Sequence, residues 1–309
     1  MSERIPFRVH PMLATLVRKP VDKSGWVYEE KYDGYRILAY KEGPAVTLVS
    51  RNGHDSTKRF SSVAKNVAAL PCHTLLLDGE VVVFDDRGIS RFQLLQNLKA
   101  RPGYAVFDCL YLDGRNLRAD PLSVRRTALE QVLAKPAASG MIFASAILSG
   151  TGPEAFAEAE RKGFEGVVAK DDSAPYIEGR SRKWLKFKVH QEDEFLIVGY
   201  TAPTGTRKHF GALLLGAHHR RRLCYVGKVG TGFTRESLDL LSKAFRPLAV
   251  RHPTLADPPE ERSVTWLAPR LVAQIAYEEL TADHKLRQPV FLGLRTDKRP
   301  QDVILPEPK

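Results

Sequence analysis

The residues best suited to covalent chemistry form the hexapeptide Lys31-Tyr-Asp-Gly-Tyr-Arg36, with Glu29 just before it. A lysine flanked by an acid and an arginine at a Gly-containing turn can serve as an amine nucleophile. A free lysine titrates near about 10.4, so attack on phosphorus requires neighbouring cations or partial desolvation. Taken alone, however, the hexapeptide fits a turn with a surface ion pair better than an active site.

Other common catalytic and nucleotide-binding signatures do not occur in the sequence. There is no GxxxxGK[ST] loop, which disfavours a P-loop NTPase, and no GxGxxG motif follows a predicted strand. The three cysteines are widely spaced without a CxxC pair, and the nine histidines offer no HExxH motif. We therefore expect neither a disulfide framework nor a structural metal.

The charge balance indicates a polyanionic partner. Among 309 residues, 47 Lys and Arg oppose 36 Asp and Glu, which gives a formal net charge of +11. Such a surface favours nucleic acid, while a basic enzyme of small phosphorylated substrates stays open as an alternative. The sequence shows neither a signal peptide nor an apolar run of the roughly 18–20 residues that cross a bilayer, so we expect a soluble, cytoplasmic protein.

Strand-like and helix-like segments alternate up to about residue 189. Segments rich in β-branched and aromatic residues predict strands at 35–40, 45–50, 75–84, 104–111 and 184–189. Helical spacing is found at 122–134 and 153–162, and Gly163 ends the second of these helices.

The pattern changes after the polar stretch 190–194. Short strands are predicted at 195–200, 210–217, 223–229 and 271–279, with one helix at 234–246. Short strands joined by Gly-containing turns around one helix are typical of a small β-barrel, including the oligonucleotide-binding (OB) type.

Further motifs change the interpretation of the hexapeptide, because together they follow the order seen in one superfamily. Lys31 to Arg36 resembles the KxDGxR nucleophile motif of covalent nucleotidyltransferases, which include ATP-dependent DNA ligases, RNA ligases and capping enzymes. The other matching segments are Ser50-Arg51-Asn52-Gly53, Asp78-Gly79-Glu80, Phe107-Asp108-Cys-Leu-Tyr111, Glu165-Gly166-Val-Val-Ala-Lys170, Trp184-Leu-Lys186-Phe-Lys188 and Arg295-Thr-Asp297-Lys298. In detail they look most like the ligase module of bacterial non-homologous end-joining ligases.

The resemblance implies a role for each motif residue in the first half of the chain. Lys31 would be the nucleophile that becomes AMP-lysine. Glu29 would accept the adenine amino group, and Phe107 would stack on the base. The remaining ATP-binding residues would be Arg36, Arg51, Glu80, Lys186 and Lys188. Lys186 and Lys188 alternate along a strand, so both point to one face, where they can neutralise the α-phosphate.

The resemblance also implies a divalent metal, Mg²⁺ or Mn²⁺, bound by Glu165 and Glu80. Mg²⁺ prefers a few carboxylates together with waters and phosphate oxygens. Asp297 and Lys298 would close over the ATP site as catalytic residues and orient the pyrophosphate. That role implies a hinge near 190–194.

The expected fold class is α+β, with two domains. Residues 1–189 would form an adenylation domain of the nucleotidyltransferase type (ATP-grasp-like, antiparallel sheets with flanking helices), and 190–309 a small OB-fold β-barrel. The position of Lys31 near the start predicts a freestanding minimal ligase without an N-terminal DNA-encircling domain, and a piece of a larger protein is the alternative.

The expected function is an ATP-dependent DNA ligase that seals 5′-phosphate/3′-hydroxyl nicks through lysyl-AMP and DNA-adenylate, in DNA repair or end joining. Its partners would be nicked duplex DNA and a Ku-like end-binding protein, with no membrane, and the enzyme would be a monomer in the bacterial cytoplasm, associated with the nucleoid. The alternatives are an RNA ligase, a GTP-using capping enzyme, and a catalytically silent nick-binding module.

Overall fold

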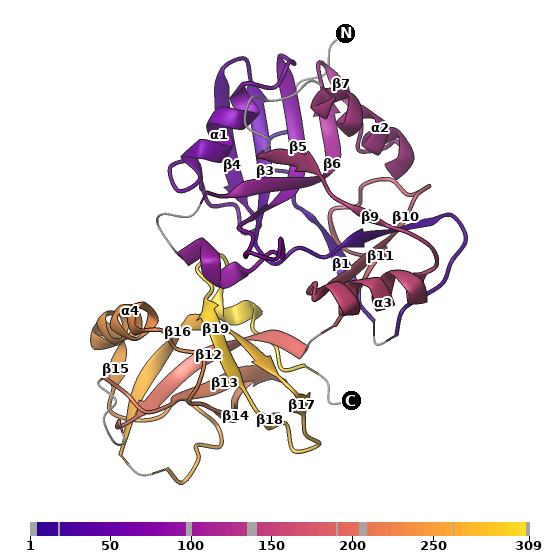
Figure 1. Ribbon diagram of the computed structural model, residues 1–309. Coiled ribbons are helices and arrows are strands. Elements are labelled where there is room, and N and C mark those ends of the chain that lie inside the picture. The colour runs from indigo at the N-terminus through magenta and orange to yellow at the C-terminus, as the bar shows by residue number, and fades with distance from the viewer. Residues whose placement is uncertain are drawn as a thin grey trace. The chain divides into compact units, whose positions relative to one another are not determined.

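The chain divides into two compact units, Met1–Val189 and His190–Lys309, each with its own core (Figure 1). The computed structural model describes residues 5–17, 19–96, 101–134, 141–189, 191–203, 209–261 and 263–306. No helix among these residues is long and apolar enough to cross a membrane.

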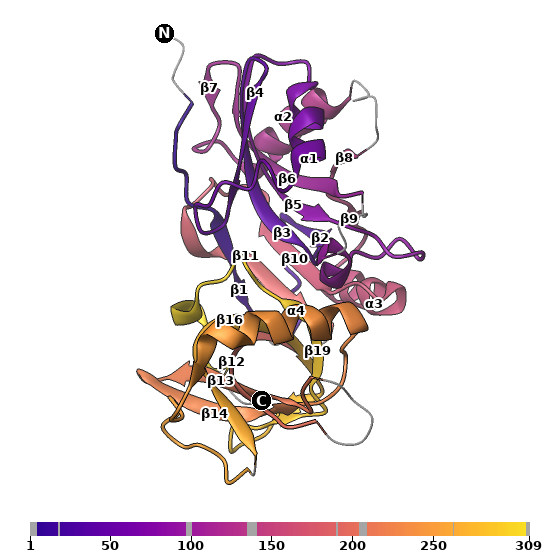
Figure 2. The same cartoon turned by 90° about the vertical axis from the view of Figure 1, so that its left-hand side faces the viewer.

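The first sheet of the N-terminal unit carries the strands predicted between residues 35 and 111. Its spatial order is β4 (Ala45–Ser50), β3 (Tyr35–Glu42), β5 (Thr74–Val82), β6 (Gly103–Leu112) and β7 (Arg115–Asn116), with β8 (Ile142–Ala144) parallel to β6. One face packs under α1 (Ser61–Ala68) and α2 (Leu122–Leu133), which lie on the same side of the sheet (Figure 2). Because side chains alternate along a strand, Ile37 enters this core while Arg36 and Leu38 face the opposite way. A 3₁₀ turn covers Phe92–Gln96.

The second sheet of this unit carries Lys186 and Lys188. Its order is β1 (Met12–Leu16), β11 (Gly179–Lys188), β10 (Gly166–Asp171), β2 (Trp26–Glu30) and β9 (Ile147–Leu148). Helix α3 (Gly152–Lys162) covers one face. It begins with a capping box between Thr151 and Glu154 and ends at Gly163, whose φ of 77° is a left-handed conformation that glycine adopts readily.

The two sheets meet through a shared aromatic cluster. Phe107 and Leu38 from the first sheet pack with Met12 and Trp184 from the second. The uncovered faces of the two sheets therefore look toward each other, which positions the polar side chains on both.

The C-terminal unit is built around one antiparallel sheet. Its strands are β12 (Gln191–Thr201), β13 (Leu213–His219), β14 (Arg222–Val229), β15 (Ala249–Val250), β16 (Val264–Tyr277) and β19 (Val290–Leu294). The other elements are α4 (Arg235–Phe245), the pair β17 (Glu279–Leu280) and β18 (Leu286–Arg287), and the 3₁₀ turns Arg246–Leu248 and Pro300–Asp302. The combination of this sheet with the mixed N-terminal unit confirms the predicted α+β class.

The polar stretch expected to act as a hinge is mostly strand. Gln191 to Glu194 pair with Tyr277 to Gln274 as the first residues of β12. The ladder pairs these residues with β16 of their own unit, and the hinge near 190–194 stays a prediction. His190 lies outside the described residues.

Candidate active site

The turn that carries Lys31 is held by three neighbouring segments. Lys31 follows the last residue of β2, and its backbone N–H donates to the Gly166 carbonyl at 3.0 Å. Asp33 accepts a hydrogen bond from the Phe92 N–H at 2.9 Å, and its own N–H donates to Ser90 Oγ at 3.0 Å. At Gly34 an added Cβ would lie 2.2 Å from the Val81 carbonyl oxygen, so only glycine fits. The backbone around the nucleophile is therefore fixed.

The ammonium of Lys31 forms an ion pair with Glu165, the residue just before β10. The Lys31 side chain is 19% exposed and that of Glu165 is 6% exposed. Lys188 Nζ lies 4.0 Å from the other Glu165 oxygen. Burial raises the pKa of Glu165, but Lys31, Lys188 and Lys186 outweigh it, so the net pKa is lowered and the carboxylate stays ionised.

The second sheet presents one polar face. Phe187 and Leu185 of β11 pack under α3, so the alternate residues Trp184, Lys186 and Lys188 point to the other side. The same alternation places Glu29 of β2 and Val168 and Lys170 of β10 on that side, opposite the buried Tyr28, Val167 and Ala169. Lys31 and Lys188 thus flank Glu165, and Lys186, on the same face as Lys188, also helps to lower the pKa of this carboxyl.

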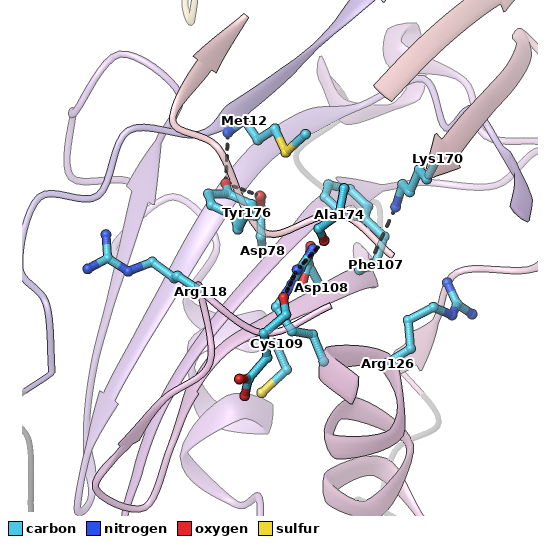
Figure 3. A network of polar contacts seen from close by, with 12 residues as sticks. Met12, Asp78, Phe107, Asp108, Cys109, Arg118, Arg126, Lys170, Ala174 and Tyr176 are labelled. Carbon is cyan, nitrogen blue, oxygen red and sulfur yellow. Dashed lines mark hydrogen bonds and ion pairs between the residues drawn. The ribbon is translucent and has the colours of Figure 1, made fainter. Parts of the chain in front are cut away.

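The first sheet contributes arginines and acids. Arg36 pairs with Asp78 through two hydrogen bonds of 2.6 Å and donates a third, from Nη2 to the Met12 carbonyl, at 3.1 Å. Tyr176 Oη donates to Asp78 at 2.6 Å and accepts from the Met12 N–H at 2.8 Å (Figure 3). Within the described residues Arg36 Nη1 makes no hydrogen bond, so its two protons can serve a ligand.

Glu80 lies beside Arg36, because the two residues are paired in the β3–β5 ladder. Ser50 pairs with Ile37 in the β3–β4 ladder, and Arg51 follows Ser50 in the turn after β4. The first sheet therefore places a carboxylate next to the Arg36 guanidinium.

Phe107 is buried between charged groups. Its ring is 9% exposed and lies 4.5 Å from the Arg36 guanidinium and 4.6 Å from Lys170 Nζ. Trp184 meets it edge-on with 5.9 Å between centroids. Stacking of a purine on Phe107 stays a prediction.

Glu29 is also buried, at 1% exposure, and it accepts hydrogen bonds from three side chains. Arg126 of α2 donates to Oε1, while Ser145 Oγ and Lys170 Nζ donate to Oε2, the lysine at 2.7 Å. Sequence reasoning missed Arg126, Ser145 and Tyr176 as contributors to the site. The sequence does contain a signal for Arg126: it forms an adjacent pair with Arg125 in the predicted helix. A helix does not need such a pair to form a polar outer face.

Asp297 and Lys298 belong to the C-terminal unit, where a polar network holds them. Arg295 pairs with Asp297 through two hydrogen bonds of 2.8 Å and donates to Gln274 at 2.7 Å. Lys298 Nζ lies 2.7 Å from Glu194 at the start of β12. The structure brings the other predicted residues together in the N-terminal unit and leaves these two in their own.

A preformed metal cage is not found in the described part of the chain, where no three His, Cys, Asp or Glu side chains converge. Mg²⁺ in proteins retains waters and uses one or two carboxylates together with phosphate oxygens. Glu165 provides an ionised carboxylate of the required kind.

Comparison with known proteins identifies the family. The ATP dependent DNA ligase domain matches residues 11–188, and the ATP dependent DNA ligase C terminal region matches 206–298. The chain belongs to the ATP-dependent DNA ligase family. This confirms the predicted enzyme class and its use of ATP, and it disfavours the RNA ligase and capping-enzyme alternatives.

Relatives of this ligase include bacterial multifunctional proteins. The chain is 41% identical over 310 residues to the multifunctional non-homologous end joining protein LigD of Pseudomonas aeruginosa, covering 97% of this chain and 37% of that protein. It is 38% identical over 303 residues to LigD of Mycolicibacterium smegmatis, covering 95% and 39%. The ligase thus spans less than two fifths of these relatives.

A solved structure of similar extent also matches. Mycobacterial DNA ligase D complexed with ATP and MES superposes with a TM-score of 0.76 at 33% identity, covering 98% of this chain and 100% of that one. The match supports the predicted fold over nearly the whole chain.

Proposed function

We propose that this ligase seals nicks in duplex DNA, between a 5′-phosphate and a 3′-hydroxyl, through an AMP-lysine formed on Lys31. The observation that carries the proposal is the cluster of Lys31, Lys186 and Lys188 around the buried carboxylate of Glu165. The cluster combines a fixed amine with positive charge on the face where a triphosphate would lie.

The proposed reaction has three steps. The Lys31 ammonium first loses a proton, and its amine then attacks the α-phosphorus of ATP, forming a P–N bond while pyrophosphate leaves. The AMP passes to the 5′-phosphate at the nick, which breaks the P–N bond and forms a pyrophosphate linkage. The 3′-hydroxyl finally attacks that phosphate, AMP leaves, and the hydroxyl proton is released. Covalent capture divides one difficult condensation into easier exchanges.

The residues around Lys31 would bind ATP and orient its phosphates and ribose. Lys186 and Lys188 would neutralise the α-phosphate, and Arg36 would use its Nη1 protons on a ribose or phosphate oxygen. Arg51, in the turn after β4, would address the 5′-phosphate, and Glu80, paired with Arg36, would address the ribose. Asp78 holds the Arg36 guanidinium in place from behind with two hydrogen bonds.

Mg²⁺ or Mn²⁺ would be held by Glu165, with Glu80 as a second carboxylate. When bound, the metal would neutralise charge that develops on the phosphates. The ion pair between Lys31 and Glu165 keeps this carboxylate ionised and ready to bind a cation.

The two units would divide the task. Residues 1–189 would carry adenylation, and 190–309, as an OB-fold domain, would supply Asp297 and Lys298 for the pyrophosphate and a surface for DNA. The net charge of +11 supports a grip on the DNA backbone. The ligase would work in bacterial end joining, in the cytoplasm at the nucleoid, as a monomer with a Ku-like end-binding protein as its partner. The names of its LigD relatives, which are non-homologous end joining proteins, support this pathway.

Formation of the lysine adduct tests the proposal. The chain is incubated with Mg²⁺ and α-labelled ATP, GTP or NAD, and the acid-stable protein–nucleotide adduct is quantified. We expect an adduct from ATP that is lost in Lys31→Ala and retained in Lys162→Ala. Lys162 is a matched control because it also pairs with a glutamate, Glu158, at 2.6 Å on α3. No adduct from ATP, or an undiminished one in Lys31→Ala, would refute the mechanism. Sealing of nicked DNA in preference to nicked RNA is expected in the same preparation.

A further inference from the structure

The carboxylate of Glu29 is contacted by three side chains from segments that are distant in the sequence. Glu29 lies in β2, Arg126 in α2, Lys170 in β10, and Ser145 directly after β8. All four residues are 8% exposed or less. A buried carboxylate is tolerated only when its charge is neutralised and its oxygens accept hydrogen bonds, and both conditions are met here.

The hydrogen bonds on Glu29 leave one defined acceptor position. A carboxylate oxygen accepts about two hydrogen bonds. Oε2 already accepts from Ser145 and Lys170, whereas Oε1 accepts only from Arg126 among the described residues. One acceptor site on Oε1 remains, and Arg126 determines its direction.

The neighbouring arginine explains why Arg126 is so well placed. Arg125 is fully buried and donates to Asp108 at 2.7 and 2.9 Å, to the Asp120 carbonyl at 2.6 Å and to the Ala174 carbonyl at 3.0 Å. These bonds anchor α2 to β6 and to the segment after β10. Within the described part of the chain Arg126, the next residue, makes one hydrogen bond, to Glu29. Arg125 thus holds the helix, and Arg126 is left to act on the carboxylate.

From this geometry we propose that Arg126 is a positioning residue that fixes Glu29 to accept the 6-amino group of a purine triphosphate. The inference rests on the proposed adenylation of Lys31. Glu29 and Lys31 are two residues apart on adjoining backbone, so both face the space between the sheets. A 6-amino group would donate to the remaining site on Oε1, whereas a 6-oxo group would bring a second acceptor against it.

The 6-amino group can be isolated experimentally by comparing ATP with purine riboside triphosphate, which has hydrogen at position 6, and with GTP. The readout is kcat/KM for formation of the Lys31 adduct by the full chain. In Arg126→Met we expect a fall of roughly 10- to 50-fold with ATP and less than about twofold with the analogue, because a hydrogen bond involving a charged group is lost only when the amino group is present. The preference over GTP should shrink by a similar factor.

Two further variants separate positioning from folding. Arg126→Lys retains a cation that can donate to Oε1, so it should recover part of the preference for ATP. Ser145→Ala removes a smaller partner from the same carboxylate and should lower the preference about threefold to tenfold. Arg161→Met, an exposed arginine on α3, is the control and should match the wild-type chain.

The outcomes distinguish this inference from the proposed function. Equal losses with ATP and the analogue in both Arg126→Met and Ser145→Ala would show a purely structural role and overturn the inference. So would an unchanged preference for ATP in both variants. Failure of the wild-type chain to form any adduct from ATP would instead overturn the proposed function, and the inference with it.

Discussion

Both units of this ligase contain an ion pair between a glutamate and a lysine that is expected to act on ATP: Lys31 with Glu165, and Lys298 with Glu194. The settings differ. Glu165, the partner of Lys31, is 6% exposed and also attracts Lys186 and Lys188. Glu194, the partner of Lys298, is 31% exposed and lies in the acidic stretch at the start of β12. The two lysines are similarly exposed, at 19% for Lys31 and 15% for Lys298, so the pairs differ in the burial of the glutamate.

The difference indicates what each carboxylate does. Removal of a buried ion-pair partner leaves an uncompensated charge, whereas an exposed pair contributes about 0–1 kcal/mol. Glu165 should therefore be indispensable to adenylation, and Glu194 should be a modest competitor of the phosphates for Lys298. Four substitutions test this contrast.

The largest effect is expected for Glu165→Gln. Glu165 is the carboxylate proposed to bind the metal, and a neutral amide would be a weak replacement. The stabilisation of transition-state charge by such a metal amounts to several kcal/mol. We expect the rate of Lys31 adduct formation to fall by at least about 100-fold. The check is single-turnover labelling with ATP and Mg²⁺. Glu158→Gln, which removes the exposed Lys162 pair, should label normally; near-normal labelling of Glu165→Gln would remove the distinction between the two kinds of pair.

Lys298→Ala should have a smaller and more selective effect. If Lys298 orients the pyrophosphate, its loss slows adenylation about 10- to 100-fold, in the range of one electrostatic contact in a transition state. Sealing by enzyme that is already adenylated should change less than about threefold, because no pyrophosphate leaves in that step. The test compares the rate of adenylation with the rate of sealing in one preparation. Equal slowing of both steps would contradict a role of Lys298 in orienting the pyrophosphate.

The sequence predicted the site where the chemistry is carried by short motifs. Alternation along 184–188 placed Lys186 and Lys188 on one face, and the helix expected at 153–162 is α3 at Gly152–Lys162. The strand expected at 271–279 begins earlier, at Val264. Its first half was not predicted because it contains Pro269, a residue that is rare within strands. Pro269 is accommodated at an irregularity in the pairing with β12. The polar stretch 191–194 begins a strand, which its composition did not indicate, and the hinge near 190–194 stays a prediction.

Buried charges were the part that local sequence could not reveal. Arg126, Asp78 and Lys170 are neutralised by residues 42 to 141 positions away. Only the tertiary fold determines whether such a residue meets a partner or water. Asp78 belongs to one of the predicted motifs, but the motif does not indicate that its carboxylate holds Arg36. That contact follows from the packing of the strands.

Glu30, the residue before Lys31, is a buried glutamate on the opposite side of β2 from the site. Its Oε1 has no hydrogen-bond partner among the described residues. Burial raises the pKa of Glu30 to about 7, although Tyr32 and Lys162 act to lower it. The folded-state pKa lies above the unfolded value, so stability falls as pH rises from about 4.5 to 7. Glu30→Gln should therefore raise the free energy of unfolding by about 2 kcal/mol at pH 8 and little at pH 5.

Denaturant unfolding at the two pH values measures this effect. Glu158→Gln provides the control, because the pKa of Glu158 is lowered by Lys162 and its charge does not change between pH 5 and 8. A gain for Glu30→Gln of the same size at both pH values would show that the carboxyl is ionised throughout.

The smallest effect is expected for Glu194→Gln, and it bears most directly on the contrast between the two pairs. Lys298 must exchange Glu194 for phosphate oxygens if it is to act on ATP, so Glu194 competes with the substrate. Loss of the negative charge should lower the KM for ATP in adenylation about threefold, the amount that a partly exposed ion pair contributes, with little change in kcat. Glu261→Gln is the matched control, because Glu261 is 29% exposed and pairs with Lys228 at 2.8 Å in the same unit. A rise in KM in Glu194→Gln would mean that the glutamate presents Lys298 to the substrate, and the pair would then be part of the site, as Lys31 and Glu165 are.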